Sequence, residues 1–449
     1  MHDSSANTFY TKLPVLIEVD LAVVGGGPAG VAAAVAASRA GLSVVLIERW
    51  PCLGGMGTAA LVNIWHTCDK ANEVILGFTK ELVERLSKYG GIRRWERFPH
   101  QYESYTFSAE WLKLVYQEVV REAKIRTLCY TPMVDVLHSD RQIEGIVIAT
   151  KQGLRRVVAA RYIDASGDGD LAAFAGAKFV VGRESDGKVQ GMTLVSHYSG
   201  IDWSDTDAVL SGSGAKDHLK QLQEEGTMPR NGHMTFTDDV HYPWNGSLML
   251  CTSGNPLDNE DLTRAAMDAR EGMPRFLDFF RKEWPGCENL QIEQTGFSLG
   301  IREGRHIEGL YKFTKDDIYG LSSFPDAIGH GFWGVDIHDP TGSGASTWVE
   351  GGQMNRLEAG ANYQIPYRIL VPKDFDNLLL AGRCASADHY GMAGLRIQSH
   401  CHIMGQAAGE AAAMSLEASV KPADIDIPAL QGRLRAAGVW IDETRTVPK

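Results

Sequence analysis

Residues 19–48 read VDLAVVGGGPAGVAAAVAASRAGLSVVLIE, in which an apolar run, a glycine-rich turn, an Ala-rich run and a second apolar run follow one another. Gly25 permits a tight bend, Gly27 lets the backbone approach a ligand closely, and Gly30 lets a helix pack on a sheet. The N-terminus of that helix supplies unpaired N–H groups and the positive end of a dipole, which suit a diphosphate. Glu48 ends the second strand, where it can accept hydrogen bonds from ribose hydroxyls and repel a 2′-phosphate. The segment therefore predicts a βαβ unit that binds a dinucleotide other than NADP.

A second glycine cluster follows directly, in the segment RWPCLGGMGT of residues 49–58. Gly54 and Gly55 provide another place where the backbone can approach the diphosphate. NAD domains lack such a cluster, whereas FAD domains of the glutathione-reductase type usually carry it. The sequence therefore favours FAD.

The composition limits the possible partners. The 449 residues include 44 Lys and Arg against 56 Asp and Glu, a formal net charge of −12 without a basic block, which argues against nucleic acid or an anionic membrane. No apolar run approaches the ~20 residues that span a bilayer, and the first residues lack the apolar centre of a signal peptide. Seven scattered cysteines fit reduced thiols, so we expect a cytoplasmic enzyme. The spacing of His, Asp and Glu predicts no metal site.

Hydrophobic periodicity and turn residues predict the remaining elements. Helices are predicted at Glu73–Lys88, at Ala109–Ala123 with Ser108 as the N-cap, and at Leu262–Glu283, and Ile92–Phe107 is interpreted as a loop. Strands are predicted at Ile125–Tyr130, Met133–His138, Ile143–Ala149, Val157–Ile163 and Leu378–Ala381. The last strand leads into a helix dense in Ala and Gly, which can pack closely against the helix after the glycine turn.

These elements predict an α/β fold: a Rossmann-like FAD-binding domain with an inserted α+β substrate domain. The FAD-binding domain takes residues 1–177, including a β-meander at about 125–163, and resumes at 368–449 with a C-terminal tail. In residues 178–367, Trp, His, Tyr and Pro become frequent and the periodicity weakens. This middle part is the predicted substrate domain, with a mixed β-sheet and helices.

From about Val19 to Ser415 the chain resembles the FAD-dependent oxidoreductase family of the glutathione-reductase-type fold. The matching blocks are GGGPAG (25–30), LGGMGT (53–58), IDASGDGDLAAFAGA (163–177), GIREGRHIEGLY (300–311), QIPYR (364–368), LLLAGRCAS (378–386) and GLRIQSHCHIMGQAAGEAAA (394–413). The resemblance implies FAD contacts at Gly25, Gly27, Pro28, Ala29, Gly30, Glu48, Arg49, Gly54, Gly55, Met56, Thr58, Val134, Gly167, Asp168, Gly382, Arg383, Gly391, Gly394, Leu395 and Arg396.

The resemblance also implies how these residues act. The strand around Val134 is expected to offer backbone hydrogen bonds to adenine. Residues 391–395, at the N-terminus of the last helix, are expected to place N–H groups near the flavin N1–C2=O edge. Many relatives have Gly-Asp where this chain has Gly382-Arg383, which puts the usual carboxylate–ribityl hydrogen bond in doubt. FAD is expected to be noncovalent, although Cys52 and His66 lie near the expected cofactor path.

Four side chains are candidates for the chemistry, each with an alternative. Arg302 would anchor a substrate carboxylate or hydroxyl by its planar fork, or belong to a buried Arg–Glu network between domains. His338 would be the active-site base, or a loop histidine satisfied by a neighbouring aspartate. His389 would reach the substrate face, or contact the FAD diphosphate. His306 stands where the family block more often has Arg and would adjust the site to the substrate.

The leading functional hypothesis is an FAD-dependent dehydrogenase or oxidase that transfers a hydride from a small polar organic substrate to flavin N5. Because the chain has no second GxGxxG domain that would bind NAD(P)H, the expected external electron acceptor is oxygen, a quinone or a protein. An FAD-dependent monooxygenase and a redox-neutral flavoenzyme are the alternatives, and a homo-oligomer is possible. His400 and His402, in the last helix, are expected to be structural.

Overall fold

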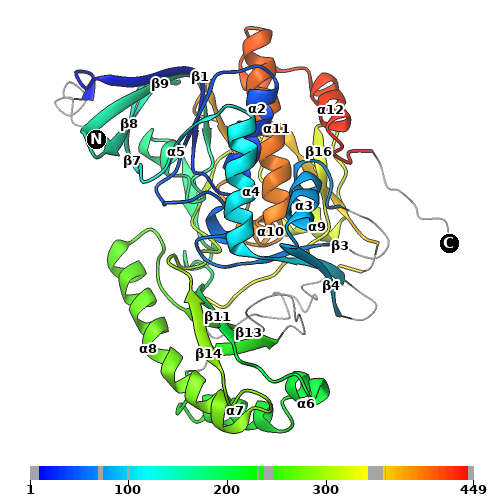
Figure 1. The fold of residues 1–449 in the computed structure, drawn as a ribbon. Coiled ribbons are helices and arrows are strands. Elements are labelled where there is room, and N and C mark those ends of the chain that lie inside the picture. Colours follow the sequence, from blue (N-terminus) through cyan, green and yellow to red (C-terminus); the bar gives the residue numbers. More distant parts are fainter. Residues whose placement is uncertain are drawn as a thin grey trace.

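The computed structural model describes residues 10–68, 74–98, 102–229, 232–236, 246–341, 357–358 and 360–442, and Figure 1 shows their arrangement. The helices are α2 (Pro28–Arg39), α3 (Phe78–Lys88), α4 (Ala109–Glu122), α5 (Asp170–Phe174), α6 (Thr206–Ser211), α7 (Ala215–Glu224), α8 (Asn259–Glu283), α9 (Lys315–Tyr319), α10 (His389–Leu395), α11 (Gln398–Glu417) and α12 (Ile427–Ala436). Short 3-10 turns are η1 (Gly55–Gly57), η2 (Tyr367–Leu370) and η3 (Pro422–Asp424).

The strands are β1 (Val15–Val24), β2 (Val44–Ile47), β3 (Ile64–Cys68), β4 (Ile92–Phe98), β5 (Tyr102–Phe107), β6 (Arg126–Leu128), β7 (Met133–Ser139), β8 (Gln142–Thr150), β9 (Gly153–Asp164), β10 (Phe179–Val181), β11 (Met192–Ser199), β12 (Gly232–Phe236), β13 (Gly246–Thr252), β14 (Gln291–Thr295), β15 (Arg305–Ile307), β16 (Ala327–Gly331), β17 (Tyr363–Pro366) and β18 (Leu378–Leu380).

Within the described residues, the largest sheet has seven strands, in the order β6-β2-β1-β9-β8-β7, with β18 beside the end of β9. β1 runs parallel to β2 and to β9, and β18 runs parallel to β9. The register pairs Val24 with both Ile47 and Asp164, and Leu380 with Asp164. The carboxyl ends of these strands therefore meet at one edge of the sheet, where ligands bind in open α/β folds. The chain has the mixed α/β fold with a parallel sheet that was predicted.

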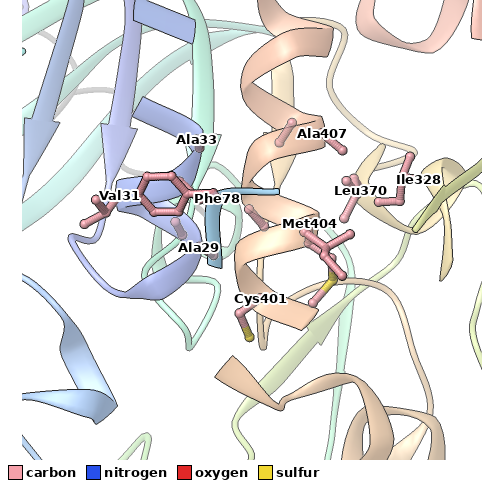
Figure 2. Packing of buried hydrophobic residues seen from close by; sticks show 14 of the residues in the cluster. Ala29, Val31, Ala33, Phe78, Ile328, Leu370, Cys401, Met404 and Ala407 are labelled. Carbon is pink, nitrogen blue, oxygen red and sulfur yellow. The ribbon is translucent and has the colours of Figure 1, made fainter. Parts of the chain in front are cut away.

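Helices α2 and α11 pack side by side although they are far apart in the sequence (Figures 1 and 2). A β-carbon on Gly405 would lie 2.1 Å from the Ala29 carbonyl oxygen, and one on Gly409 would lie 2.3 Å from the Ala33 carbonyl oxygen. Figure 2 shows Ala29 and Ala33 on α2, beside α11. The close packing predicted from the small residues of the last helix is therefore present.

The first strand of the predicted β-meander does not pair with the strand that follows it. β7, β8 and β9 are antiparallel neighbours, but β6 pairs in parallel with β2 at the far edge of the same sheet. The stretch 125–163 thus divides between the parallel and the antiparallel part of one sheet.

The prediction of a loop at residues 92–107 is wrong. β4 and β5 pair with each other, and β5 also pairs with β3, in a three-stranded antiparallel sheet. Tyr105 and Phe107 lie two positions apart on one face of β5 and pack into the main core. Because the segment is rich in Arg, its sequence is interpreted as a loop and not as two strands.

Two predicted helices are close to their observed bounds, and a third is shorter. α4 is capped by Ser108, whose hydroxyl accepts from the Trp111 N–H at 3.4 Å. α8 is capped by Asp258 and extends to Glu283. α3 begins only at Phe78, because the preceding residue, Gly77, has a φ of 57°, which is outside the range of a right-handed helix.

A second hydrophobic core is formed by residues drawn from 192–301. It lies between α8 and a four-stranded sheet of order β12-β13-β11-β14, and Figure 1 shows this lobe with α6 and α7 below the main sheet. Buried side chains from 313–371, in contrast, belong to the main core. The inserted domain remains a proposal, and its own core occupies only part of the predicted range 178–367.

Among the described residues, no helix is both long and apolar enough to cross a lipid bilayer. Cys52, Cys129, Cys251, Cys287, Cys384 and Cys401 are free thiols.

Candidate active site

The glycine-rich turn after β1 places a different constraint on each glycine. Gly25 has a φ of 100°, in the left-handed region that favours glycine. A β-carbon on Gly30 would lie 1.7 Å from the Gly25 carbonyl oxygen, so the first turn of α2 touches the preceding bend. A β-carbon on Gly27 would meet only the Gly55 α-carbon, at 4.0 Å. Internal packing therefore explains Gly25 and Gly30 but not Gly27, whose face is open to a ligand.

The second glycine cluster lies directly against the first. The Gly54 N–H donates to the Gly26 carbonyl at 2.8 Å, and Gly54 has a φ of 109°. Gly55 follows with a φ of 49° and begins η1. The Thr58 hydroxyl donates to the Leu53 carbonyl at 2.7 Å and closes the turn. The two clusters form one backbone cradle beside the N-terminus of α2.

Glu48 is buried at the end of β2, with 4% of its surface exposed. Its Oε2 accepts from the Gly26 N–H at 2.7 Å, and its Oε1 accepts from the Trp50 N–H at 2.8 Å. Burial raises the pKa of Glu48, although these N–H donors oppose the shift. Because each carboxylate oxygen has two lone pairs, both can accept a further hydrogen bond from a ribose.

The loops after β9 and β18 meet at a buried ion pair. Arg383 Nη1 donates to Asp168 Oδ1 at 2.7 Å. A β-carbon on Gly167 would lie 2.8 Å from Arg383 Nη2, and one on Gly304 would lie 2.3 Å from Asp168 Oδ1. Gly382 packs against the first turn of α2, since its β-carbon would lie 3.0 Å from an alanine methyl there. The site therefore continues from α2, past the ion pair, to the segment around Gly304.

Residues 389–395 do not begin the long C-terminal helix, contrary to the prediction. They form the separate helix α10, and Ile397, with extended backbone angles, precedes α11 at Gln398. Asp388 caps α10 by accepting from the Gly391 N–H at 2.6 Å, so this N–H already has a partner. The N-terminus of the long helix, predicted at Gly391, Gly394 and Leu395, therefore lies at Gln398 instead, where α11 begins.

The N-terminus of α11 lies beside the residues that follow the second glycine cluster. Gln398 Nε2 donates to the Val62 carbonyl at 2.7 Å, and a β-carbon on Gly57 would lie 2.6 Å from Gln398 Oε1. Ser399 is 1% exposed, and its hydroxyl has no hydrogen-bond partner among the described residues. A long helix thus begins beside the cradle, and its first turn contains N–H groups without helical partners, at 398–400, and a buried unpaired hydroxyl.

Two of the predicted catalytic histidines meet at one carboxylate. His389 Nδ1 lies 2.8 Å from Glu303 Oε1, and His306 Nε2 lies 2.9 Å from the same oxygen. The three side chains are 3%, 1% and 0% exposed for His389, His306 and Glu303. Burial alone would raise the pKa of Glu303, but the two imidazoles lower it to about 2. Glu303 is therefore an anion at neutral pH.

Arg302 and Glu303 both contact the segment that begins at Gln190. The Gln190 N–H donates to Glu303 Oε2 at 2.8 Å. Arg302 Nη1 donates to the Gly191 carbonyl at 2.7 Å and to Thr193 Oγ1 at 2.6 Å. Burial lowers the pKa of Arg302 to about 10. The Arg–Glu network weighed for Arg302 does not form, because Glu303 binds the histidines instead.

His338 lies on the other side of Gln190. The His338 N–H donates to Gln190 Oε1 at 3.3 Å, and His338 Nε2 lies 3.7 Å from Asp336 Oδ1. Arg396 Nη2 donates to the Asp336 carbonyl at 2.9 Å and to its Oδ2 at 3.2 Å. The structure thus gathers Arg302, His306, His338, His389 and Arg396 around Gln190, Glu303 and Asp336.

The remaining predicted residues fall at the edges of this site. Val134 lies at a register shift of β7 and is 39% exposed, so its backbone is outside the regular ladder. Arg49 is exposed, with its guanidinium 5.2 Å from the centre of the Trp50 ring, and Met56 lies within η1. Cys52 is half-buried near Thr58, and His66 lies in β3. The described residues contain no group of three His, Cys, Asp or Glu side chains that fits a metal ion.

A model of the FAD-dependent oxidoreductase family matches residues 20–434. The chain belongs to this family. It is an FAD-dependent oxidoreductase, and FAD is its cofactor. The open face of Gly27 and the unpaired Ser399 hydroxyl fit this group, because internal packing accounts for neither.

Matches to individual proteins are more distant. A segment of 68 residues is 43% identical to part of the thiamine thiazole synthase of Desulfosudis oleivorans. This segment makes up 15% of this chain and 24%, about a quarter, of that protein. A geranylgeranyl bacteriochlorophyll reductase-like protein from Thermoplasma acidophilum has 16% identity and a TM-score of 0.45, over 94% of this chain and 83% of that one. The anhydrotetracycline hydroxylase OxyS from Streptomyces rimosus has 12% identity and a TM-score of 0.43, over 94% and 65%.

Proposed function

We propose that this enzyme is a dehydrogenase or oxidase that removes a hydride from a small polar organic substrate. Bound FAD would supply the hydride acceptor, at N5, as a C–OH or C–NH group of the substrate becomes C=O or C=N. The protein must bind the substrate, orient it and take the proton that leaves oxygen or nitrogen. The observation that carries this proposal is the buried His389–Glu303 pair beside the dinucleotide cradle.

His389 is the better candidate for the proton acceptor. The Glu303 carboxylate accepts a hydrogen bond from Nδ1–H, which selects the tautomer with a lone pair on Nε2. Nε2 makes no hydrogen bond within the described residues. His338 Nε2 lies 3.7 Å from Asp336 Oδ1, which is beyond hydrogen-bond distance for that pair. We therefore assign the proton to His389 Nε2 and give His338 a supporting role.

We assign the cofactor contacts along the path described above, in a fold of the glutathione-reductase type. The adenosine end would use Glu48 and the backbone at Val134, and the diphosphate would use the cradle of Gly27 and Gly54. The N–H groups at 398–400, with Ser399, are the chain's own donors for the ring end. The sequence alone predicts residues 391–395 as these donors, but the long helix α11 begins only after Ile397, so we assign the contact to 398–400.

The electron acceptor in this proposal is oxygen, a quinone or a protein, since the sequence offers no second dinucleotide-binding domain of the β-strand, GxGxxG, α-helix type. A nicotinamide dinucleotide would have no dedicated module.

Anaerobic reduction of the purified holoenzyme tests the proposal. Small alcohols, hydroxy acids and amines are mixed with the enzyme, and the visible absorbance of the flavin is followed. We expect at least one class to bleach the flavin, and oxygen or a quinone to restore it. Rapid bleaching by NADPH alone, or NADPH consumption stimulated by an aromatic compound, would contradict the dehydrogenase and favour a hydroxylase.

A further inference from the structure

We infer that the substrate carries a carboxylate, and that it is bound by Arg302, which forms no direct ion pair, and by the unpaired side-chain amide N–H₂ of Gln190. This inference rests on the proposed function, because it names the class of substrate for the same site. It is supported by the hydrogen bonds of Arg302, by those of Gln190 and by the arrangement of the surrounding carboxylates.

Arg302 forms no direct ion pair with a carboxylate among the described residues. Its Nη1 donates to two neutral oxygens, those of the Gly191 carbonyl and the Thr193 hydroxyl. Burial lowers the pKa of Arg302, and two neighbours oppose this shift: the Cys251 side chain, which hydrogen-bonds to the guanidinium, and Asp336, which lies beyond ion-pair distance. A partly buried guanidinium without a direct ion pair is costly, because charge is removed from water with little compensation. An anionic ligand would supply that compensation.

Gln190 adds a second unpaired donor. Its side chain is 0% exposed, and its Oε1 accepts from the His338 N–H, which fixes the direction of the amide. Its Nε2 has no hydrogen-bond partner among the described residues. A buried amide N–H₂ without an acceptor costs free energy in the free protein, and an oxygen of a bound ligand would remove that cost.

The neighbouring carboxylates are already engaged. Glu303 binds His306 and His389, and Asp336 binds Arg396. Neither forms a direct ion pair with Arg302. The same two anions would repel a dianion such as a phosphate monoester, whereas a monoanionic carboxylate matches the planar, two-donor edge of a guanidinium.

Both sides of the site are brought together by one segment. Gln190 donates its backbone N–H to Glu303, and the next carbonyl accepts from Arg302. A carboxylate on Arg302 would therefore be bound next to the Glu303–His389 pair that takes the proton. We expect a small carboxylate whose oxidised carbon lies close to the carboxyl group, such as a 2-hydroxy or 2-amino acid.

Calorimetric titration of the oxidised holoenzyme tests this inference without turnover. The probes are two matched pairs, acetate with acetamide and benzoate with benzamide, which differ in charge but hardly in shape and carry no oxidisable C–OH or C–NH group. We expect the carboxylate of at least one pair to bind about 10- to 100-fold more tightly than its amide, which corresponds to a hydrogen-bonded charge. Equal affinity within both pairs, or no binding of either carboxylate, would overturn the inference.

Two variants and one control locate the site. R302K and Gln190→Met should each weaken carboxylate binding, R302K by about tenfold or more, because the planar fork is lost. R161K is the matched control, since Arg161 also donates to a hydroxyl and to backbone carbonyls without a carboxylate partner. Its carboxylate affinity should equal that of the parent enzyme. Wild-type affinity in R302K, with FAD content unchanged, would overturn the inference.

The two proposals fail separately. If carboxylates bind through Arg302 but no substrate of any class bleaches the flavin, the carboxylate site stands and the dehydrogenase fails. If neutral alcohols bleach the flavin and carboxylates do not bind, the dehydrogenase stands and the inference about Arg302 is wrong.

Discussion

The carboxylate of Asp168 accepts a hydrogen bond from Arg383 Nη1 at 2.7 Å, and the two side chains are 6% and 10% exposed. They come from the loops after β9 and β18, 215 residues apart. Many flavoproteins of the glutathione-reductase type have Gly-Asp where this chain has Gly382-Arg383, and Arg383 pairs here with the carboxylate of Asp168. The pair therefore joins the two parts of the chain that flank the inserted lobe.

Breaking one side of this pair should cost more than removing both. Arg383→Met leaves an unpaired buried carboxylate, which is expected to lower the free energy of unfolding by about 3–5 kcal/mol. The double variant with Asp168→Asn should recover part of this loss, since it leaves no charge behind. Urea unfolding of the single and double variants measures the coupling. Strictly additive losses would show that the two side chains act independently.

Gly27→Ala should spare the fold and weaken FAD binding. The added methyl would meet no protein atom closer than 4.0 Å, and the φ of −72° suits alanine. It would occupy the space assigned to the diphosphate, at a cost of about 1–3 kcal/mol, or about 5- to 150-fold in affinity. Fluorescence titration of the apoprotein with FAD measures this change.

Gly30→Ala is the contrasting variant. Its methyl would lie 1.7 Å from the Gly25 carbonyl oxygen, so it should damage folding itself. If Gly27→Ala bound FAD as tightly as the parent protein, the assignment of the diphosphate to this face would be wrong.

Gly405→Ala should destabilise the contact between α2 and α11. Its methyl would lie 2.1 Å from a backbone carbonyl, and overpacking of this kind costs about 1–3 kcal/mol or more. Gly432→Ala is the matched control, because Gly432 lies inside α12 with no atom within 4 Å of the added methyl. That substitution should stabilise the protein by about 0.5–1 kcal/mol through helix propensity. Thermal melting of both variants should therefore shift in opposite directions, and equal shifts would contradict the packing argument.

The dinucleotide half of the site could be predicted because its signal is local. Gly25, Gly27 and Gly30 lie in one short segment, and the strands on both sides of it have the expected apolar runs. The interruption before α11 could not be predicted in the same way. Ile397 is apolar, and no Gly or Pro marks the position, so the sequence resembles one continuous helix.

The catalytic half depends on contacts between distant residues. His306, His338 and His389 were recognised from their motifs, but the carboxylate that orients two of them was considered only as a partner of Arg302. Gln190 was missed altogether, because it lies 113 residues from Glu303 and in no motif. Only the folded chain shows that both contact the same site.

Glu303→Gln should lower kcat by about 10²- to 10⁴-fold with a much smaller change in KM. The amide cannot bind both imidazoles as an anion does, so His389 loses its fixed tautomer and the charge that stabilises its protonated form. Glu308→Gln, five residues along and exposed beside Lys373, is the control. A structural role alone would lower FAD content and melting temperature along with kcat, so both are measured. A kcat within twofold of the parent value would remove Glu303 from the mechanism.

His402 should make the protein less stable in mild acid. Its ring is buried in α11, where Nε2 lies 2.8 Å from the Tyr116 hydroxyl and Nδ1 lies 3.0 Å from Thr79 Oγ1. Burial lowers the pKa of His402 from 6.5 to about 3. Between these values the unfolded chain binds a proton that the folded chain does not, so the free energy of unfolding falls as the pH falls. The contribution of this one group is about 1.4 kcal/mol per pH unit.

Urea unfolding of the parent protein and of His402→Gln, from pH 7 to pH 4, isolates this contribution. The variant should be less stable at pH 7, because it loses two buried hydrogen bonds, but its stability should depend less steeply on pH. The exposed His218, replaced by Gln, controls for the loss of a histidine as such. His197 and His400, whose pKa values burial lowers to about 4, should retain a similar slope in every variant. If His402→Gln kept the full slope of the parent, the ring would have to accept its proton within the folded chain, and the buried neutral form assigned to it would be wrong.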